Sequence, residues 1–291
     1  MTQPVGRPAG DSPILTVEDL RVQFPGRVAA VEAVRGVSFV VGREKLGIVG
    51  ESGSGKSMTG RAILRLVPAP GRVTARRLVF EGIDLLAASE PAMRRIRGER
   101  IAMVLQDPKF SLNPVMPVGD QVAEAWRVHS GASWRESRRR ALEMLEAVRI
   151  RNPERVYHAY PHEVSGGMGQ RVMIAMMLAA GPDLLIADEP TSALDVTVQM
   201  QVLAILDDLV TERGMGLIFI SHDLNLVASF CDRVLIMYAG RIVETCRAQD
   251  LAAARHPYTQ GLLRSLPRVD RPVTELAVLE RDPAWRDEGP A

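Results

Sequence analysis

A glycine-rich segment that ends in a lysine and a serine is the feature of this sequence with the clearest chemical meaning. Residues 50–57 read Gly-Glu-Ser-Gly-Ser-Gly-Lys-Ser, which matches the pattern G-x-x-x-x-G-K-[ST]. The glycines let the backbone turn tightly, so that successive N–H groups point inward at phosphate oxygens. Lys56 can reach the β- and γ-phosphates of a nucleotide, and the hydroxyl of Ser57 can coordinate Mg²⁺. The expected phosphate cradle consists of Gly50, Glu51, Ser52, Gly53, Ser54, Gly55, Lys56 and Ser57.

Two adjacent carboxylates follow an apolar run further along the chain. The segment Leu184-Leu-Ile-Ala-Asp-Glu189 reads as a buried strand that ends in Asp188 and Glu189. Side chains alternate along a strand, so the two carboxylates should point to different places. We expect Asp188 to hold Mg²⁺, directly or through water, and Glu189 to polarise the attacking water as general base. Such a pair is often only the start of a solvated loop, but the phosphate cradle upstream favours the catalytic interpretation.

A second candidate anion site lies at residues 164–170, Val-Ser-Gly-Gly-Met-Gly-Gln, ahead of a predicted helix. Ser165 is a good N-cap residue. Gly166 and Gly167 leave the first N–H groups of the helix bare, as an anion site requires. On this heptapeptide alone, a plain capped helix start is an equally good interpretation.

These groups need strands and helices to position them, and the hydrophobic pattern predicts such elements. Apolar or β-branched runs between Gly and Pro residues predict strands at 14–17, 21–24, 36–41, 46–50, 78–80, 101–105, 184–187 and 217–220. Helices are expected at 56–67 and at 171–180. A third should begin after Ser133, whose spacing from Glu136 is that of a capping box. A fourth is expected in an amphipathic stretch that Gly214 can end. Strands that alternate with helices favour an α/β fold with a mostly parallel sheet covered on both faces.

Composition and charge narrow the class of protein. The 291 residues are 46% hydrophobic and 24% charged, which excludes a disordered or collagen-like chain. The net charge is +1 and only 4% of residues are aromatic, so we expect no nucleic-acid partner. Cys231 and Cys246 are expected to be reduced thiols. The sequence contains neither a recognisable export signal nor a run of about 18 apolar residues.

The motifs occur in the order found in the ATP-binding subunits of ABC transporters, which this sequence resembles. Phe24 lies where that family stacks an aromatic residue on adenine, and Gln106 lies at the Q-loop position. Residues 164–170 match the signature, and Ser192-Ala-Leu-Asp195 matches the D-loop. His222 occupies the position of the switch histidine.

The resemblance covers roughly residues 14–267 and implies their fold. It implies an α/β P-loop NTPase with a RecA-like core, an antiparallel β subdomain and a helical subdomain inserted at about 107–180. Residues 1–13 would form an N-terminal tail and residues 268–291 a C-terminal one.

Roles for single residues also follow from the resemblance. Such ATPases close as head-to-tail dimers, with ATP between the P-loop of one subunit and the signature of the other. Ser165 and Gly167 would then contact the γ-phosphate bound by the partner subunit, and His222 would contact it within the same subunit. The resemblance also implies nucleotide contacts for the wider set Ser165, Gly166, Gly167, Gln170 and Asp195. The expected catalytic residues are Lys56, Gln106, Glu189 and His222, and the expected Mg²⁺ ligands are Ser57, Gln106 and Asp188.

A narrower resemblance concerns the transported solute. Residues 106–114 and the segment His256-Pro-Tyr-Thr-Gln-Gly-Leu-Leu263 are similar to the peptide/nickel branch of ABC importers. That branch implies import of peptides or a related solute, such as a nickel chelate or an opine-like compound. It also implies two transmembrane permease subunits, a second ATPase subunit and an extracytoplasmic solute-binding protein. The location would be the cytoplasmic face of a bacterial inner membrane.

Three departures from the family pattern stand out. Val164 replaces the usual Leu, a conservative change from which we expect a modest effect. Gly169 stands where a larger polar residue is common, a change that would weaken or retune the signature site. Residues 268–291 contain no cysteine, so we expect no iron–sulfur cluster there.

Two other functions compete with the importer. A soluble ABC ATPase that acts on DNA or ribosomes would be expected to carry a coiled coil, zinc-binding cysteines or a second ATPase domain, none of which we find. An exporter ATPase is disfavoured by residues 256–263.

Overall fold

The computed structural model describes residues 13–26, 30–107, 111–192, 194–265 and 282–286. Most of the two expected tails lies outside these ranges. The same holds for residues 108–110 of the Q-loop segment and for residue 193 of the D-loop.

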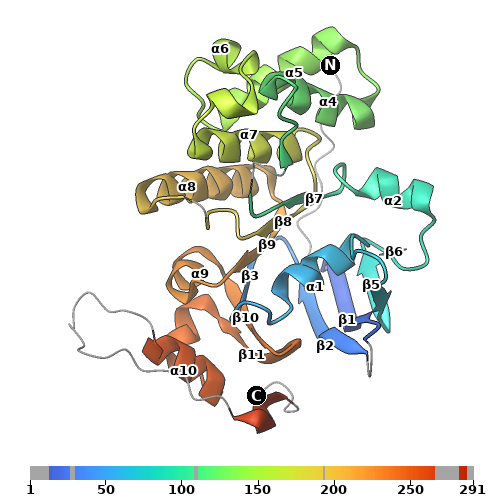
Figure 1. Cartoon of the computed structure of the whole chain (residues 1–291), viewed down its shortest axis with the longest axis vertical. Coiled ribbons are helices and arrows are strands. Elements are labelled where there is room, and N and C mark those ends of the chain that lie inside the picture. Colours follow the sequence, from blue (N-terminus) through green and yellow to red (C-terminus); the bar gives the residue numbers. More distant parts are fainter. Residues whose placement is uncertain (1–12, 27–29, 108–110, 193, 266–281, 287–291) are drawn as a thin grey trace.

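A six-stranded sheet forms the centre of the molecule (Figure 1). Its strand order is β11-β10-β3-β9-β8-β7, and every neighbouring pair is parallel except β10 with β11. The strands are β3 (Lys45–Val49), β7 (Ile101–Val104), β8 (Leu184–Asp188), β9 (Gly216–Ser221), β10 (Arg233–Tyr238) and β11 (Arg241–Arg247). The mostly parallel sheet expected from the sequence is therefore confirmed.

A second, antiparallel sheet lies beside the first. Its order is β2-β1-β5-β6, and β4 also pairs with β1. Its strands are β1 (Leu15–Phe24), β2 (Val31–Val41), β4 (Arg72–Thr74), β5 (Arg77–Phe80) and β6 (Ile83–Asp84). The two strands expected at 14–17 and 21–24 form one strand, whose register shifts around Asp19, a residue with φ of 50°.

Helices cover both faces of the parallel sheet. The helices of the described residues are α1 (Lys56–Ile63), α2 (Glu90–Ile96), α4 (Val118–Ser130), α5 (Trp134–Ala147), α6 (Pro153–Tyr157), α7 (Gly166–Leu178), α8 (Val196–Arg213), α9 (Leu224–Phe230) and α10 (Pro257–Ser265). Short 3-10 turns lie at η1 (Pro161–Glu163), η2 (Ala248–Ala253) and η3 (Pro283–Arg286). The predicted capping box forms at the start of α5, and Gly214, with φ of 56°, ends α8 as expected.

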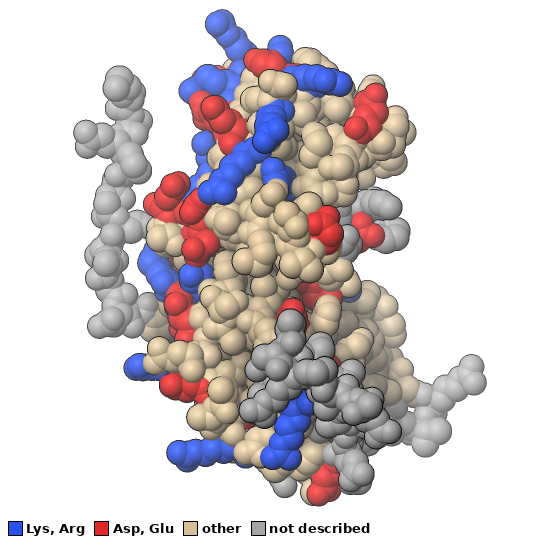
Figure 2. Space-filling view, turned by 90° about the vertical axis from the view of Figure 1, so that its left-hand side faces the viewer, with Lys and Arg blue, Asp and Glu red and all other residues tan. Residues whose placement is uncertain are grey.

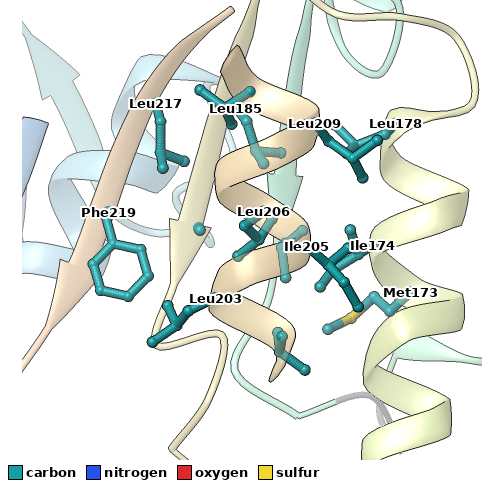
Figure 3. Packing of buried hydrophobic residues seen from close by; sticks show 14 of the residues in the cluster. Met173, Ile174, Leu178, Leu185, Leu203, Ile205, Leu206, Leu209, Leu217 and Phe219 are labelled. Atoms are coloured by element: carbon teal, nitrogen blue, oxygen red, sulfur yellow. The ribbon is translucent and has the colours of Figure 1, made fainter. Parts of the chain in front are cut away.

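Successive side chains of a strand point to opposite faces of the sheet, so the core is divided into two layers. Leu184 and Ile186 of β8 belong to the layer shared with α1 and the antiparallel sheet. Leu185 and Ala187 point to the other face, where α8 covers them. Figure 3 shows Leu206 of α8 in this second layer, between the sheet and helix α7. Burying one such Leu contributes about 1.5–3 kcal/mol, so the two layers hold the strand ends in fixed positions.

The chain between β7 and β8 is mainly helical. Helices α4, α5, α6 and α7 follow β7, and α7 packs on α8, which links them to the sheet (Figure 1). The structure shows these helices where the sequence predicts an inserted subdomain, while its exact limits stay a prediction. None of the helices in the described part of the chain is long and apolar enough to span a membrane.

Candidate nucleotide site

The glycine-rich loop connects the end of β3 to the start of α1. Gly50 has φ of 153°, and a Cβ added there would lie 2.1 Å from the carbonyl oxygen of Met237. Gly55 has φ of 100°, and its Cβ would lie 2.5 Å from the oxygen of Ala33. Both positions therefore require glycine. Gly55 is also the N-cap of α1 and has no side chain to cover the first N–H groups of the helix.

The predicted lysine is buried inside this loop. Lys56 is 4% exposed, and its Nζ donates to the carbonyl oxygens of Gly50 at 2.7 Å and Glu51 at 2.9 Å. Burial lowers the pKa of Lys56, while the carboxylates of Glu189, Asp188 and Glu51 act in the opposite direction. The nearby carboxylates therefore do not fully offset the cost of burying the ammonium, and an anionic phosphate beside it would stabilise its charge.

Ser57 and Asp188, two of the three residues predicted to hold a metal ion, are in direct contact. The hydroxyl of Ser57 donates to Oδ1 of Asp188 at 2.7 Å. Asp188 is 4% exposed, and burial raises its pKa, opposed by the hydrogen bond from Ser57. Oxygen donors of this kind fit Mg²⁺, a hard cation. The described residues contain no group of three His, Cys, Asp or Glu that could hold a metal.

Glu189 directly follows the last residue of β8 and contacts other groups than Asp188 does. Its Oε2 accepts a hydrogen bond from Nε2 of Gln106 at 3.3 Å, and its Oε1 lies 3.3 Å from Nδ1 of His222. The backbone of Glu189 has φ of 48°, a left-handed conformation that costs a non-glycine residue about 1–3 kcal/mol. Its N–H donates to the oxygen of Ile220 at 2.9 Å, a bond that holds this conformation.

Five of the predicted catalytic and metal-binding residues, Lys56, Ser57, Gln106, Glu189 and His222, share one cavity of about 580 Å³, and Asp188 does not line it. It is lined by Ala33, Ser52, Gly53, Gly55, Lys56, Ser57, Met58, Gln106, Glu189 and His222. The structure thus brings together the P-loop, the Q-loop glutamine, the candidate general base and the candidate switch histidine. Sequence reasoning missed Ala33 and Met58, whose apolar side chains give no chemical signal.

Other predicted residues do not line this cavity. Phe24 packs near Gly71, where an added Cβ would lie 2.6 Å from its ring. Ser165 accepts a hydrogen bond from the N–H of Met168 at 3.3 Å and caps α7, as predicted. The helix starts at Gly166, ahead of the predicted residue 171. Gln170 is buried, with 1% of its surface exposed.

The start of α7 packs closely on the start of α8. A Cβ on Gly167 would lie 2.5 Å from Cγ1 of Val198, whereas a Cβ on Gly166 would meet open space. Asp195, expected at a nucleotide, accepts a hydrogen bond from the N–H of Val198 at 3.0 Å and is the N-cap of α8. The hydroxyl of Ser192 donates to the backbone oxygen of Glu189 at 3.2 Å, so the D-loop is tied to the candidate base.

Comparison with known proteins gives consistent matches. The family model described as ABC transporter matches residues 34–192. A probable peptide ABC transporter ATP-binding protein, y4tR of Sinorhizobium fredii, is 52% identical over 87% of this chain and 77% of its own length. The oligopeptide transport ATP-binding protein OppD of Bacillus subtilis is 50% identical over 88% of this chain and 73% of its own.

Solved structures give the same result at lower identity. The ATP-binding cassette MJ0796, a dimer in a post-hydrolysis state bound to ADP and Pi, has a TM-score of 0.72 and 27% identity, covering 80% of this chain and 98% of its own. The chain cbiO1 of Clostridium perfringens, part of the ABC transporter complex cbiONQ, has a TM-score of 0.71 and 26% identity. That match covers 84% of this chain and 92% of the neighbour.

Proposed function

Because this chain belongs to the ABC transporter family, whose ATPases hydrolyse ATP to power transport, we propose that it energises an importer of peptides or a related solute. The solute class rests on relatives with about half of their residues identical, which are named as peptide, dipeptide and oligopeptide transport proteins. The segment at 256–263 supports the same branch.

The observation that carries the proposal is the position of Glu189 in the cavity of the P-loop. Its carboxylate faces the same space as Lys56 and is held by Gln106 and His222. Glu189 would accept a proton from the water that attacks the γ-phosphorus, as the bond to the departing ADP breaks. Lys56 would bind the phosphate oxygens before and during this step, so its contribution is mainly to hold the nucleotide in position.

The magnesium ligands proposed here are the side chains of Ser57, Asp188 and Gln106. When bound, Mg²⁺ would neutralise charge that builds up on the β- and γ-phosphate oxygens. Ser57 and Asp188 already lie in contact, and burial of the Asp188 carboxylate makes a bound cation favourable there.

The signature residues would act on the nucleotide of a second ATPase subunit. They do not line the cavity of their own chain, yet Gly166 and Ser165 form an open helix start. A head-to-tail dimer would place this helix start at the partner's phosphates. The dimeric state of the neighbour MJ0796 supports this arrangement.

The remaining partners follow from the same proposal. Two permease subunits and an extracytoplasmic binding protein would complete the importer, with this chain at the cytoplasmic face of the membrane. On the face drawn in Figure 2, basic and acidic side chains are interspersed, in keeping with a net charge of +1. This pattern gives no support to the alternative of an ATPase that binds nucleic acid.

Reconstitution tests the proposal. The chain, co-purified with its membrane partners, would be placed in vesicles with the solute-binding protein and candidate peptides. We expect ATP hydrolysis that rises when peptide-loaded binding protein is added, and peptide uptake that requires ATP. Co-purification with ribosomes or DNA alone, or hydrolysis coupled to outward transport, would overturn the importer assignment.

A further inference from the structure

A tyrosine from the C-terminal part of the chain touches the phosphate-binding loop. The backbone N–H of Glu51 donates a hydrogen bond to the hydroxyl oxygen of Tyr258 at 3.1 Å, although the two residues are 207 positions apart. Tyr258 lies on α10, which contributes no residue to the lining of the nucleotide cavity. We propose that Tyr258 is a positioning residue for Lys56 and, through it, for the nucleotide phosphates; this rests on the proposed ATPase function.

The argument begins with a single peptide unit. The carbonyl of Gly50 and the N–H of Glu51 belong to the same planar group, so their directions are coupled. The carbonyl accepts the hydrogen bond from Nζ of Lys56 at 2.7 Å, while the N–H donates to Tyr258. The tyrosine hydroxyl therefore fixes the orientation of the plane that presents an acceptor to the lysine.

The loop needs the hydrogen bond to Tyr258 because its first residue, Gly50, can adopt many backbone conformations. Gly50 has φ of 153°, and glycine can rotate to many other backbone conformations at little cost. Rotation of the Gly50–Glu51 peptide would move the carbonyl away from Lys56. The ammonium would then keep the Glu51 carbonyl, at 2.9 Å, but lose one of the two oxygens that hold it.

The ring of Tyr258 is fixed by packing that does not involve its hydroxyl. The side chain is 0% exposed, and its ring lies 4.5 Å from that of Tyr238 and 6.2 Å from that of Trp285. The backbone N–H of Tyr258 donates to Nδ1 of His256 at 3.1 Å. The carboxylate of Glu244 in turn accepts hydrogen bonds from the backbone N–H groups of His256 at 3.3 Å and Arg255 at 2.6 Å. Tyr258→Phe would keep these ring and backbone contacts and lose only the hydroxyl.

Displacement of Lys56 should affect KM for ATP rather than kcat. Lys56 holds the phosphates both before and during the reaction, so a displaced Lys56 weakens binding of ground and transition states alike. Loss of such uniform binding raises KM and leaves kcat unchanged. A residue needed only for folding would instead reduce the amount of active protein, and hence the apparent kcat, without altering KM.

The test compares two tyrosine-to-phenylalanine variants of the whole chain. We expect Tyr258→Phe to raise KM for ATP by about 5- to 20-fold, with kcat within twofold of the unmodified chain. Tyr238→Phe, the matched control in the neighbouring ring, should change neither value by more than twofold. The dissociation constant for ATP, measured with Glu189→Gln as background, should rise by the same factor as KM.

Two results would overturn the inference: a KM for Tyr258→Phe within twofold of the unmodified chain, or an equal rise in KM for Tyr238→Phe. A fall in kcat with unchanged KM would also overturn it, because that pattern indicates a role in folding alone. Failure of the proposed function looks different. In that case the unmodified chain would bind no ATP, or Lys56→Ala would bind it equally well, and the inference would fall with the function.

Discussion

Nδ1 of His222 lies 3.3 Å from Oε1 of Glu189. The other carboxylate oxygen faces Gln106, so the glutamate bridges two residues, and each of the three follows a different strand. Those strands, β9, β8 and β7, are adjacent and parallel, and their carboxyl ends share one edge of the sheet. Ligands of open α/β sheets bind at this edge. The strand order thus assembles the candidate catalytic groups from positions far apart in sequence.

Replacement of the candidate base separates binding from chemistry. In Glu189→Gln the side chain keeps its size but can no longer accept a proton from water. We expect kcat for ATP hydrolysis to fall by about 100-fold or more, and the dissociation constant for ATP to stay within threefold. Steady-state hydrolysis and equilibrium binding measure the two effects. Glu212→Gln, on the exposed surface of α8, is the control and should behave as the unmodified chain. Hydrolysis by Glu189→Gln at the unmodified rate would show that Glu189 is not the base.

Mixing two inactive variants tests whether the signature acts across subunits. Lys56→Ala lacks a working P-loop but keeps Ser165, and Ser165→Ala has the opposite defect. In a head-to-tail dimer of one chain of each kind, both defects fall in one site and the other site is intact. Random mixing should therefore restore about a quarter of the unmodified hydrolysis rate, if the two sites are independent. Ser165 also caps α7, so unfolding of Ser165→Ala is measured alongside, with an expected loss of about 1 kcal/mol. A mixture no more active than either variant alone would contradict a shared site.

The close packing of α7 on α8 predicts opposite outcomes at two adjacent glycines. Gly167→Ala would place a Cβ 2.5 Å from Val198, and we expect a loss of about 1–3 kcal/mol in the free energy of unfolding. Gly166→Ala meets open space and should change that free energy by less than about 1 kcal/mol. Urea unfolding measures both. Adding Val198→Ala to Gly167→Ala should recover part of the loss, giving a coupling of about 0.5–3 kcal/mol in a double-mutant cycle. Strict additivity of the two changes would argue against this contact.

Local sequence determined much of the phosphate site. The glycines, the apolar strand before them and the helix after them are neighbours in the chain, so one segment carries the whole pattern. The same is true of the strand that ends in Asp188 and of the capping box at Ser133. In each case the hydrogen bonds or the alternation that fix the structure act over a few residues.

Features that depend on distant parts of the chain were not predictable in this way. Strand β1 continues through Asp19 because β2 and β5 pair with it. The residues next to Asp19 in the sequence do not reveal this pairing. Strands β10 and β11 went unpredicted, although the apolar run at 234–238 carried a signal. The predicted helix at 56–67 ends at Ile63, where Leu64 leaves helical geometry. The contact of Tyr258 with Glu51 has no local signal at all.

Ionisation of Asp188 should make the stability of the nucleotide-free chain depend on pH. Burial raises the pKa of this carboxyl above its ordinary value near 3.9, so folding favours the protonated form. The stability that this group contributes is complete below about pH 4 and is lost as pH rises through the raised pKa. Asn cannot ionise, so Asp188→Asn avoids the loss. We expect urea unfolding to show the variant more stable at pH 7 by roughly 0.5–2 kcal/mol, with a smaller difference near pH 4. Asp250→Asn, at an exposed position, should show neither effect. A gain that is equal at both pH values would mean that the charge of Asp188 is not its cause.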